Sequence, residues 1–150
     1  MMRKTLALII AALLAIPMLG AIVSTSTDDV QEIAEPMAQS VIDGLENDDY
    51  DAFSKYFAAR LKVVLTESRF KTQQSYFEKN LGSLANVEYL GHVNYTSYTR
   101  TIFKAYASTA EQEVLMWFDI DKRTVTVSGS QQDRYYLIGF EIQPPPTASE

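Results

Sequence analysis

The chain contains no cysteine and a single histidine, His92. Disulfides, thiolate catalysis, cysteine-ligated metal centres and a lipid-modified cysteine are therefore excluded. One histidine also excludes multi-histidine metal sites and leaves a single imidazole for acid–base chemistry. Glycine-rich phosphate loops, nucleophile elbows and paired metal ligands are missing as well. The sequence therefore specifies no catalytic residue set, no metal and no cofactor, and it leaves enzymatic activity an open question.

Positive charge is scarce. Lysine and arginine number 13 against 19 acidic residues, which gives a formal net charge of −6. Such a surface repels phosphate backbones and is only weakly attracted to anionic lipid headgroups. We therefore expect no nucleic-acid partner, and we expect membrane contact only through the N-terminal segment.

The N-terminus has the layout of an export signal. Residues 1–4 are short and positive, Leu6–Val23 is apolar and uncharged, and residues 24–29 are small, polar and acidic. An uncleaved anchor stays open, because a bilayer span needs about 20 apolar residues. The positive flank places the domain outside the cytoplasm in both cases. We predict that residues 1–23 are a signal peptide or membrane anchor, and that the protein is secreted or anchored outside the cytoplasm.

Helices are predicted in the first half of the rest of the chain. Residues 28–47 carry one apolar stripe at three- and four-residue spacings. Pro36 interrupts this stripe, so we expect the ordered helix to begin near Glu35, behind a looser tether over residues 24–34. A second helix is predicted from Tyr50 to about Ala59, capped by Asp48 or Asp49. These carboxylates, with Asp51, are explained by helix capping better than by a calcium loop.

A third helix is predicted from Glu67 to about Leu81, with Thr66 as its N-cap and Gly82 just beyond its end. Charge is uneven over the helical half. Residues 28–51 hold nine acidic side chains and no basic one, whereas residues 55–79 hold six basic and two acidic side chains. We interpret both runs as solvated faces of neighbouring helices.

Strands are predicted after Gly82, over residues 87–95, 98–107, 113–120, 124–128 and 135–142. Residues 121–123 are expected to form a tight connection, residues 129–133 a turn, and residues 144–150 a proline-rich tail. In the third strand, Val114, Met116, Phe118 and Ile120 share one face, while Leu115, Trp117 and Asp119 share the other. Helices followed by antiparallel strands predict one α+β domain over residues 35–143, with helices packed on a curved sheet.

Residues 41–53 read VIDGLENDDYDAF, a helix end followed by an acidic break and then by aromatics. With Phe57–Leu65, Leu81-Gly82, Tyr89-Leu90-Gly91 and the later strands, this resembles small secreted domains of unknown function in the nuclear-transport-factor-2-like (cystatin-like) superfamily. The resemblance covers Glu35 to Ile142. It implies a cone, in which a bent antiparallel sheet wraps around helices and leaves a pocket at the open end. Catalytic members place an Asp and a Tyr, or a His–Asp pair, in the pocket, and neither spacing occurs here.

Four side chains are candidate site residues. Asp119 shares a strand face with Trp117, and in an apolar pocket its pKa would rise enough for a general base; solvation beside a turn is the simpler interpretation. Tyr106 and Trp117 suit a ligand pocket, because each has an apolar body and a polar tip. By strand alternation, His92 is expected on one face with Leu90 and Asn94, opposite Val93.

Three functions remain open from the sequence. The first is a non-enzymatic exported domain that binds a small molecule, a peptide or a protein. The second is a structural, self-associating domain, such as a homodimer, which an exposed face of Val114, Met116 and Phe118 would favour. The third is an isomerase- or dehydratase-like enzyme that uses Asp119 or His92 together with a tyrosine.

Overall fold

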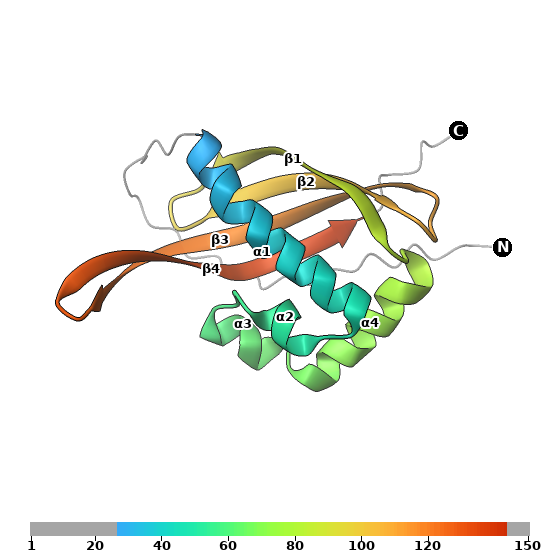
Figure 1. Cartoon of the computed structure of the whole chain (residues 1–150), viewed down its shortest axis with the longest axis horizontal. Coiled ribbons are helices and arrows are strands. Elements are labelled where there is room, and N and C mark those ends of the chain that lie inside the picture. Colours follow the sequence, from blue (N-terminus) through green and yellow to red (C-terminus); the bar gives the residue numbers. More distant parts are fainter. Residues whose placement is uncertain (1–26, 144–150) are drawn as a thin grey trace.

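The computed structural model describes residues 27–143. Four helices precede four strands, and Figure 1 shows α1 running diagonally across the sheet, with α2, α3 and α4 gathered near its C-terminal end. The predicted signal peptide or anchor at residues 1–23 and the tail at residues 144–150 lie outside the described residues. None of the helices within residues 27–143 is long and apolar enough to cross a membrane.

Helix α1 spans Thr27–Asn47 without interruption. The expectation that it begins near Glu35 is wrong, because Pro36 lies inside the helix on its exposed side. A proline there costs about 3 kcal/mol in an isolated helix. Packing offsets this cost, since helices in proteins are stabilised mainly by their buried face. That face is formed by Val30, Ala34, Met37, Ala38, Val41, Ile42 and Leu45.

The predicted helix from Tyr50 to Ala59 is two short helices, α2 (Tyr50–Ser54) and α3 (Ala59–Val64). They are separate because the segment between them bonds to the sheet: the Ala58 amide donates to the Leu137 carbonyl at 2.8 Å, and the Leu137 amide donates to the Tyr56 carbonyl at 2.8 Å. Asp49 caps α2 as predicted, since its carboxylate accepts from the amides of residues 51 and 52.

Helix α4 spans Glu67–Asn80, close to the predicted range. Thr66 occupies its N-cap position, but the threonine side chain makes no capping hydrogen bond. Gly82 follows the helix with a φ of +71°, and its amide donates to the Phe77 carbonyl at 3.0 Å. This is the role predicted for Gly82. Glycine is favoured after a helix because it adopts the left-handed conformation without steric strain.

The strands are β1 (Leu84–Asn94), β2 (Thr99–Ala107), β3 (Gln112–Val127) and β4 (Ser130–Gln143). They form one antiparallel sheet in the order β1-β2-β3-β4. The predicted break at residues 121–123 is wrong, because these residues pair continuously with residues 134–136. The hairpin instead turns at Ser128 and Gly129, whose φ angles of +51° and +83° suit a two-residue turn, so the turn expected at residues 129–133 is wrong as well.

The α+β class is therefore confirmed, with helices followed by an antiparallel sheet that does not close. Strands β3 and β4 continue past β2, which begins where Thr99 pairs with Ile120. Residues 121–136 therefore form a two-stranded ribbon, called the arm below, which extends beyond the other strands in Figure 1.

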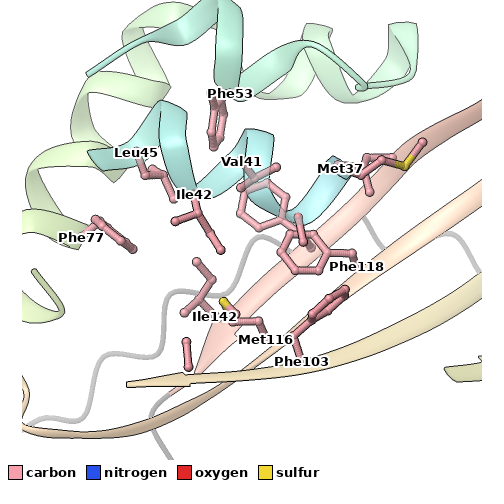
Figure 2. Packing of buried hydrophobic residues seen from close by; sticks show 14 of the residues in the cluster. Met37, Val41, Ile42, Leu45, Phe53, Phe77, Phe103, Met116, Phe118 and Ile142 are labelled. Carbon is pink, nitrogen blue, oxygen red and sulfur yellow. The ribbon is translucent and has the colours of Figure 1, made fainter. Parts of the chain in front are cut away.

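The core lies between the helices and one face of the sheet, called the inner face (Figure 2). On β3 this is the face of Val114, Met116, Phe118 and Ile120, all buried, so the predicted alternation is confirmed. The idea that Val114, Met116 and Phe118 form an exposed association surface is wrong, because the helices cover them. None of the four helices within residues 27–143 covers the opposite face, called the outer face.

Candidate binding site

The four candidate residues lie on two different faces of the sheet. Trp117 pairs with Ile102 and Asp119 pairs with Arg100, and these residues belong to the outer face. His92 pairs with Thr101, which is fully buried, so His92 lies on the inner face because directly paired residues share a face. The structure therefore separates His92 from Trp117 and Asp119.

Asp119 is held by Arg100. The guanidinium donates to both carboxylate oxygens, at 2.7 Å from Nε and 2.8 Å from Nη2. This hydrogen bonding to Asp119 raises the pKa of Arg100, against a smaller opposing effect of burial. The guanidinium also lies 5.9 Å from the ring centroids of Tyr95 and Tyr98, which stack on each other. Asp119 therefore serves as the acceptor of a planar, bidentate ion pair, in which both of its carboxylate oxygens are engaged.

Trp117 and Tyr106 do not form a common pocket. The Trp117 indole donates from Nε1 to Glu141 Oε2 at 2.9 Å. Tyr106 pairs with Glu113, four residues before Trp117 on β3, and so lies about 13 Å away along the strand. Between them the outer face carries Leu115 beside Lys104. The predicted combination of these residues around a ligand is therefore not formed.

A groove opens instead between α1 and the inner face of β1. Its volume is about 440 Å³. Its lining consists of Glu35, Pro36, Gln39, Val87, Tyr89 and Phe103. The sequence did not indicate this site, because Glu35 and Pro36 were expected at the start of α1 and nothing local places that part of the helix beside β1. The feature of the sequence that could have pointed to such a groove is the aromatic content of the predicted strands.

A bulge in β1 positions the groove's polar end. The β1–β2 register shifts between Tyr89 and Gly91, so Tyr89, which pairs with buried Phe103, and His92 lie on the same face although they are three residues apart. Strict alternation would have placed them on opposite faces. The Tyr89 hydroxyl and His92 Nδ1 are 2.8 Å apart. The expectation that Leu90 shares this face is not met: Leu90 falls within the bulge, has no paired residue on β2 and is 48% exposed.

Tyr89 links this polar pair to the aromatic floor. Its ring meets Phe103 edge-to-face at 5.3 Å between centroids. Burial raises the pKa of Tyr89 above its ordinary value, so the phenol keeps its proton at neutral pH. When the imidazole is neutral with its proton on Nε2, the Tyr89 hydroxyl donates to Nδ1. The groove is therefore lined by two aromatic rings, and the hydroxyl of one of them, Tyr89, is held by His92.

The helical wall of the groove is polar and acidic. Gln31 donates to the Glu35 carboxylate at 2.6 Å, and Gln39 donates to the Asp43 carboxylate at 2.7 Å. Both pairs join residues four apart on α1, a spacing at which helical side chains meet. They hold the groove residues Glu35 and Gln39 along the helix rather than across the opening. A carboxylate therefore stands at the rim of an aromatic groove.

The acidic residues around Asp48 do not gather as a cation site. Asp49 caps α2, and Asp48 forms an ion pair with Lys71 at 2.8 Å. Across residues 27–143, no group of three or more potential metal ligands comes together. The predicted helix cap is thus confirmed for Asp49, whereas Asp48 is engaged in an ion pair.

Comparisons with known proteins give no assignment. A scan against protein-family models matches no family, and searches of the curated proteins and of the solved structures return no match. The resemblance to the nuclear-transport-factor-2-like superfamily stays a prediction from the sequence.

Proposed function

We propose that the protein is a non-enzymatic exported binding domain and that a small molecule, or one side chain of a peptide, occupies the groove between α1 and β1. The observation that carries this proposal is the groove itself, at about 440 Å³ with an aromatic floor and a few fixed polar groups. Small-molecule sites are typically concave and mostly apolar, with few polar groups that set orientation. We also propose membership of the nuclear-transport-factor-2-like superfamily, supported by helices that pack on one face of an antiparallel sheet.

The enzymatic alternative has weaker geometric support. Asp119 and His92 lie on opposite faces of the sheet, so they share no site, and Asp119 is engaged by Arg100. A general base has to lie within hydrogen-bonding reach of the proton it removes. An isomerase- or dehydratase-like mechanism would therefore depend on His92 and Tyr89 alone.

A fragment screen followed by NMR tests the binding function. The full chain, expressed with its own N-terminal segment and held in lipid nanodiscs if that segment is retained, is titrated with small aromatic fragments. Amide shifts are expected at Gln39, Val87 and Tyr89, in the groove. Val87→Arg fills the groove and should abolish these shifts, whereas Leu115→Arg on the outer face should preserve them. Shifts confined to the outer face, or no binding at all, would contradict the proposal.

Self-association through the outer face is a second candidate function. In the described part of the chain no helix covers this face, which carries half-buried Ile102, Leu115 and Trp117. Val93, at 46% exposed, pairs with Arg100, and Tyr106, at 42% exposed, pairs with Glu113. Trp, Tyr and Arg are the residue types that dominate binding energy at protein interfaces.

Sedimentation equilibrium tests this second candidate. A concentration-dependent dimer that Trp117→Ala weakens at least tenfold would support it. The matched control is Val63→Ala, which removes apolar surface from an exposed side chain of α3, far from the outer face. A monomer at millimolar concentration would exclude association through this face.

A further inference from the structure

We propose that the groove between α1 and β1 selects organic cations, that is, molecules with a protonated amine on a flat apolar body. This inference rests on the proposed binding function and adds the chemical class of the ligand. It follows from three features of the groove: the charge of its helical wall, the arrangement of its aromatic floor, and the position of the nearest basic side chains.

The charge of the helical wall has one sign. Glu35 lines the groove, and Glu32 and Asp43 are exposed on the same helix. From residue 28 to residue 51 the chain holds nine acidic side chains and no basic one. The Glu35 carboxylate is met by Gln31, a neutral donor, so its negative charge is not cancelled by a cation. A cationic ligand is attracted to this wall, and an anionic one is repelled.

The floor offers a cation the half-buried ring of Tyr89, with Phe103, which is only 1% exposed, packed against it. Tyr89 and Phe103 meet edge-to-face, an arrangement in which the edge of one ring points at the face of the other. A cation within about 6 Å of a ring centroid is attracted by the negative face of that ring. Val87 and Pro36 add apolar surface beside the rings. The apolar body of a ligand therefore has a surface to cover while its charged end stays near Glu35.

Basic side chains near the groove are already engaged or lie elsewhere. Lys104, next to Phe103 in sequence, points to the outer face and forms an ion pair with Glu88 at 3.0 Å. His92 is engaged with the Tyr89 hydroxyl, which lies 2.8 Å from its Nδ1. The basic residues of the run 55–79 lie on α3, on α4 and at Lys55 just after α2, and these elements gather at the other end of α1 (Figure 1). Within residues 27–143 Glu35 forms no ion pair with a basic side chain, so we expect the complementary positive charge to come from the ligand.

Three probes that share a phenylethyl group test this selectivity on the full chain at pH 8. They are phenethylammonium, neutral 2-phenylethanol and anionic 3-phenylpropionate, each titrated by NMR. We expect the ammonium to bind about fivefold more tightly than the alcohol, and the carboxylate to bind most weakly. Raising the salt concentration should narrow the gap between ammonium and alcohol, because a solvent-accessible charge contact is screened.

Glu35→Gln is the decisive variant. It keeps the shape of the side chain, so the affinity for the ammonium should fall to that of the alcohol, while the affinity for the alcohol stays unchanged. Glu67→Gln makes the same chemical change on the exposed surface of α4 and should alter neither affinity.

The outcomes separate the two proposals. If none of the three probes binds in the groove, the proposed binding function fails and this inference fails with it. If the alcohol or the carboxylate binds as tightly as the ammonium, the groove binds ligands but cation selectivity is overturned. A preference for the ammonium that survives Glu35→Gln also overturns the inference, since the selectivity would then come from other groups.

Discussion

Gly44 of α1 lies directly against the backbone of Phe53 in α2. A Cβ atom added at this position would stand 2.4 Å from the Phe53 amide nitrogen and 2.6 Å from its Cα. Real Cβ atoms do not approach backbone atoms so closely, so the two helices would have to separate. Phe53 is fully buried among other aromatic rings, and its displacement would disturb the centre of the core.

We therefore expect Gly44→Ala to lower the free energy of unfolding by about 3 kcal/mol. Helix propensity alone predicts the opposite sign, since alanine is favoured over glycine by about 1 kcal/mol inside a helix. Urea denaturation of the full chain measures the difference. Ser75→Ala, at an exposed position of α4, is the control and should change stability by no more than about 0.5 kcal/mol. A Gly44→Ala protein as stable as the wild type would show that α1 and α2 are less tightly packed than described.

At the scale of elements, the arm formed by residues 121–136 is held by cross-strand side-chain contacts instead of by a core. Lys122 pairs with Asp133 at 2.8 Å, and the Thr124 hydroxyl donates to the same carboxylate at 2.9 Å. Arg123 contacts Asp121 on its own strand and lies over the ring of Tyr136 on the other. An isolated two-stranded ribbon is marginally stable in water, so contacts of this kind decide how far the arm stays paired.

The pH dependence of the arm follows from Asp133. The hydrogen bond from Lys122, followed by that from Thr124, lowers the pKa of Asp133 below its ordinary value. The ionised carboxylate therefore stabilises the folded arm above the ordinary carboxyl pKa of about 3.9, and this contribution is lost as the pH falls through the lower pKa of the folded state. In Lys122→Met, the titration midpoint of Asp133, followed by NMR of the carboxyl carbon, should rise toward the ordinary value. Arg123→Met should leave that midpoint in place; equal midpoints in wild type and Lys122→Met would contradict the pairing.

At the scale of the whole molecule, the helical layer is joined to the sheet by backbone hydrogen bonds as well as by the core. The segment between α2 and α3 forms a parallel bridge with β4, in which Ala58 and Tyr56 bond to Leu137. This bridge fixes the position of α3 against β4 and occupies part of the β4 edge. The bridge therefore joins residues 56–58, early in the described chain, to Leu137, close to its end.

Two neighbouring proline substitutions test this connection. The φ of Ala58 is −60°, which proline adopts, so Ala58→Pro removes the amide that bonds to Leu137 without straining φ. We expect a loss of about 1–3 kcal/mol in unfolding free energy, because a carbonyl is left without its donor. Ala59→Pro changes the first residue of α3, where proline is tolerated, and should be neutral or slightly stabilising. Urea denaturation measures the unfolding free energy of both variants. Equal values for Ala58→Pro and Ala59→Pro would show that the bridge contributes nothing to stability.

Much of the fold could be predicted from the sequence because its determinants are local. The apolar stripe of α1, the Asp49 cap, the left-handed Gly82 and the alternation along β3 each depend on residues within one or two turns or one strand. Their order along the chain was enough to predict helices packed on an antiparallel sheet. The filled inner face of Val114, Met116 and Phe118 follows from that alternation, although its burial by helices was not foreseen.

The tertiary structure determined which residues come together at the candidate site. Burial of one face of α1 against the sheet keeps the helix continuous through Pro36, and that continuity places Glu35 beside β1. A bulge, which sequence alternation does not reveal, brings Tyr89 and His92 together, and strand register separates both from Asp119. The sequence by itself thus determined the elements and their buried faces, since these follow from hydrophobic periodicity and capping. Only packing and register determined which polar groups meet, because even Tyr89 and His92, three residues apart, share a face through the way β1 pairs with β2.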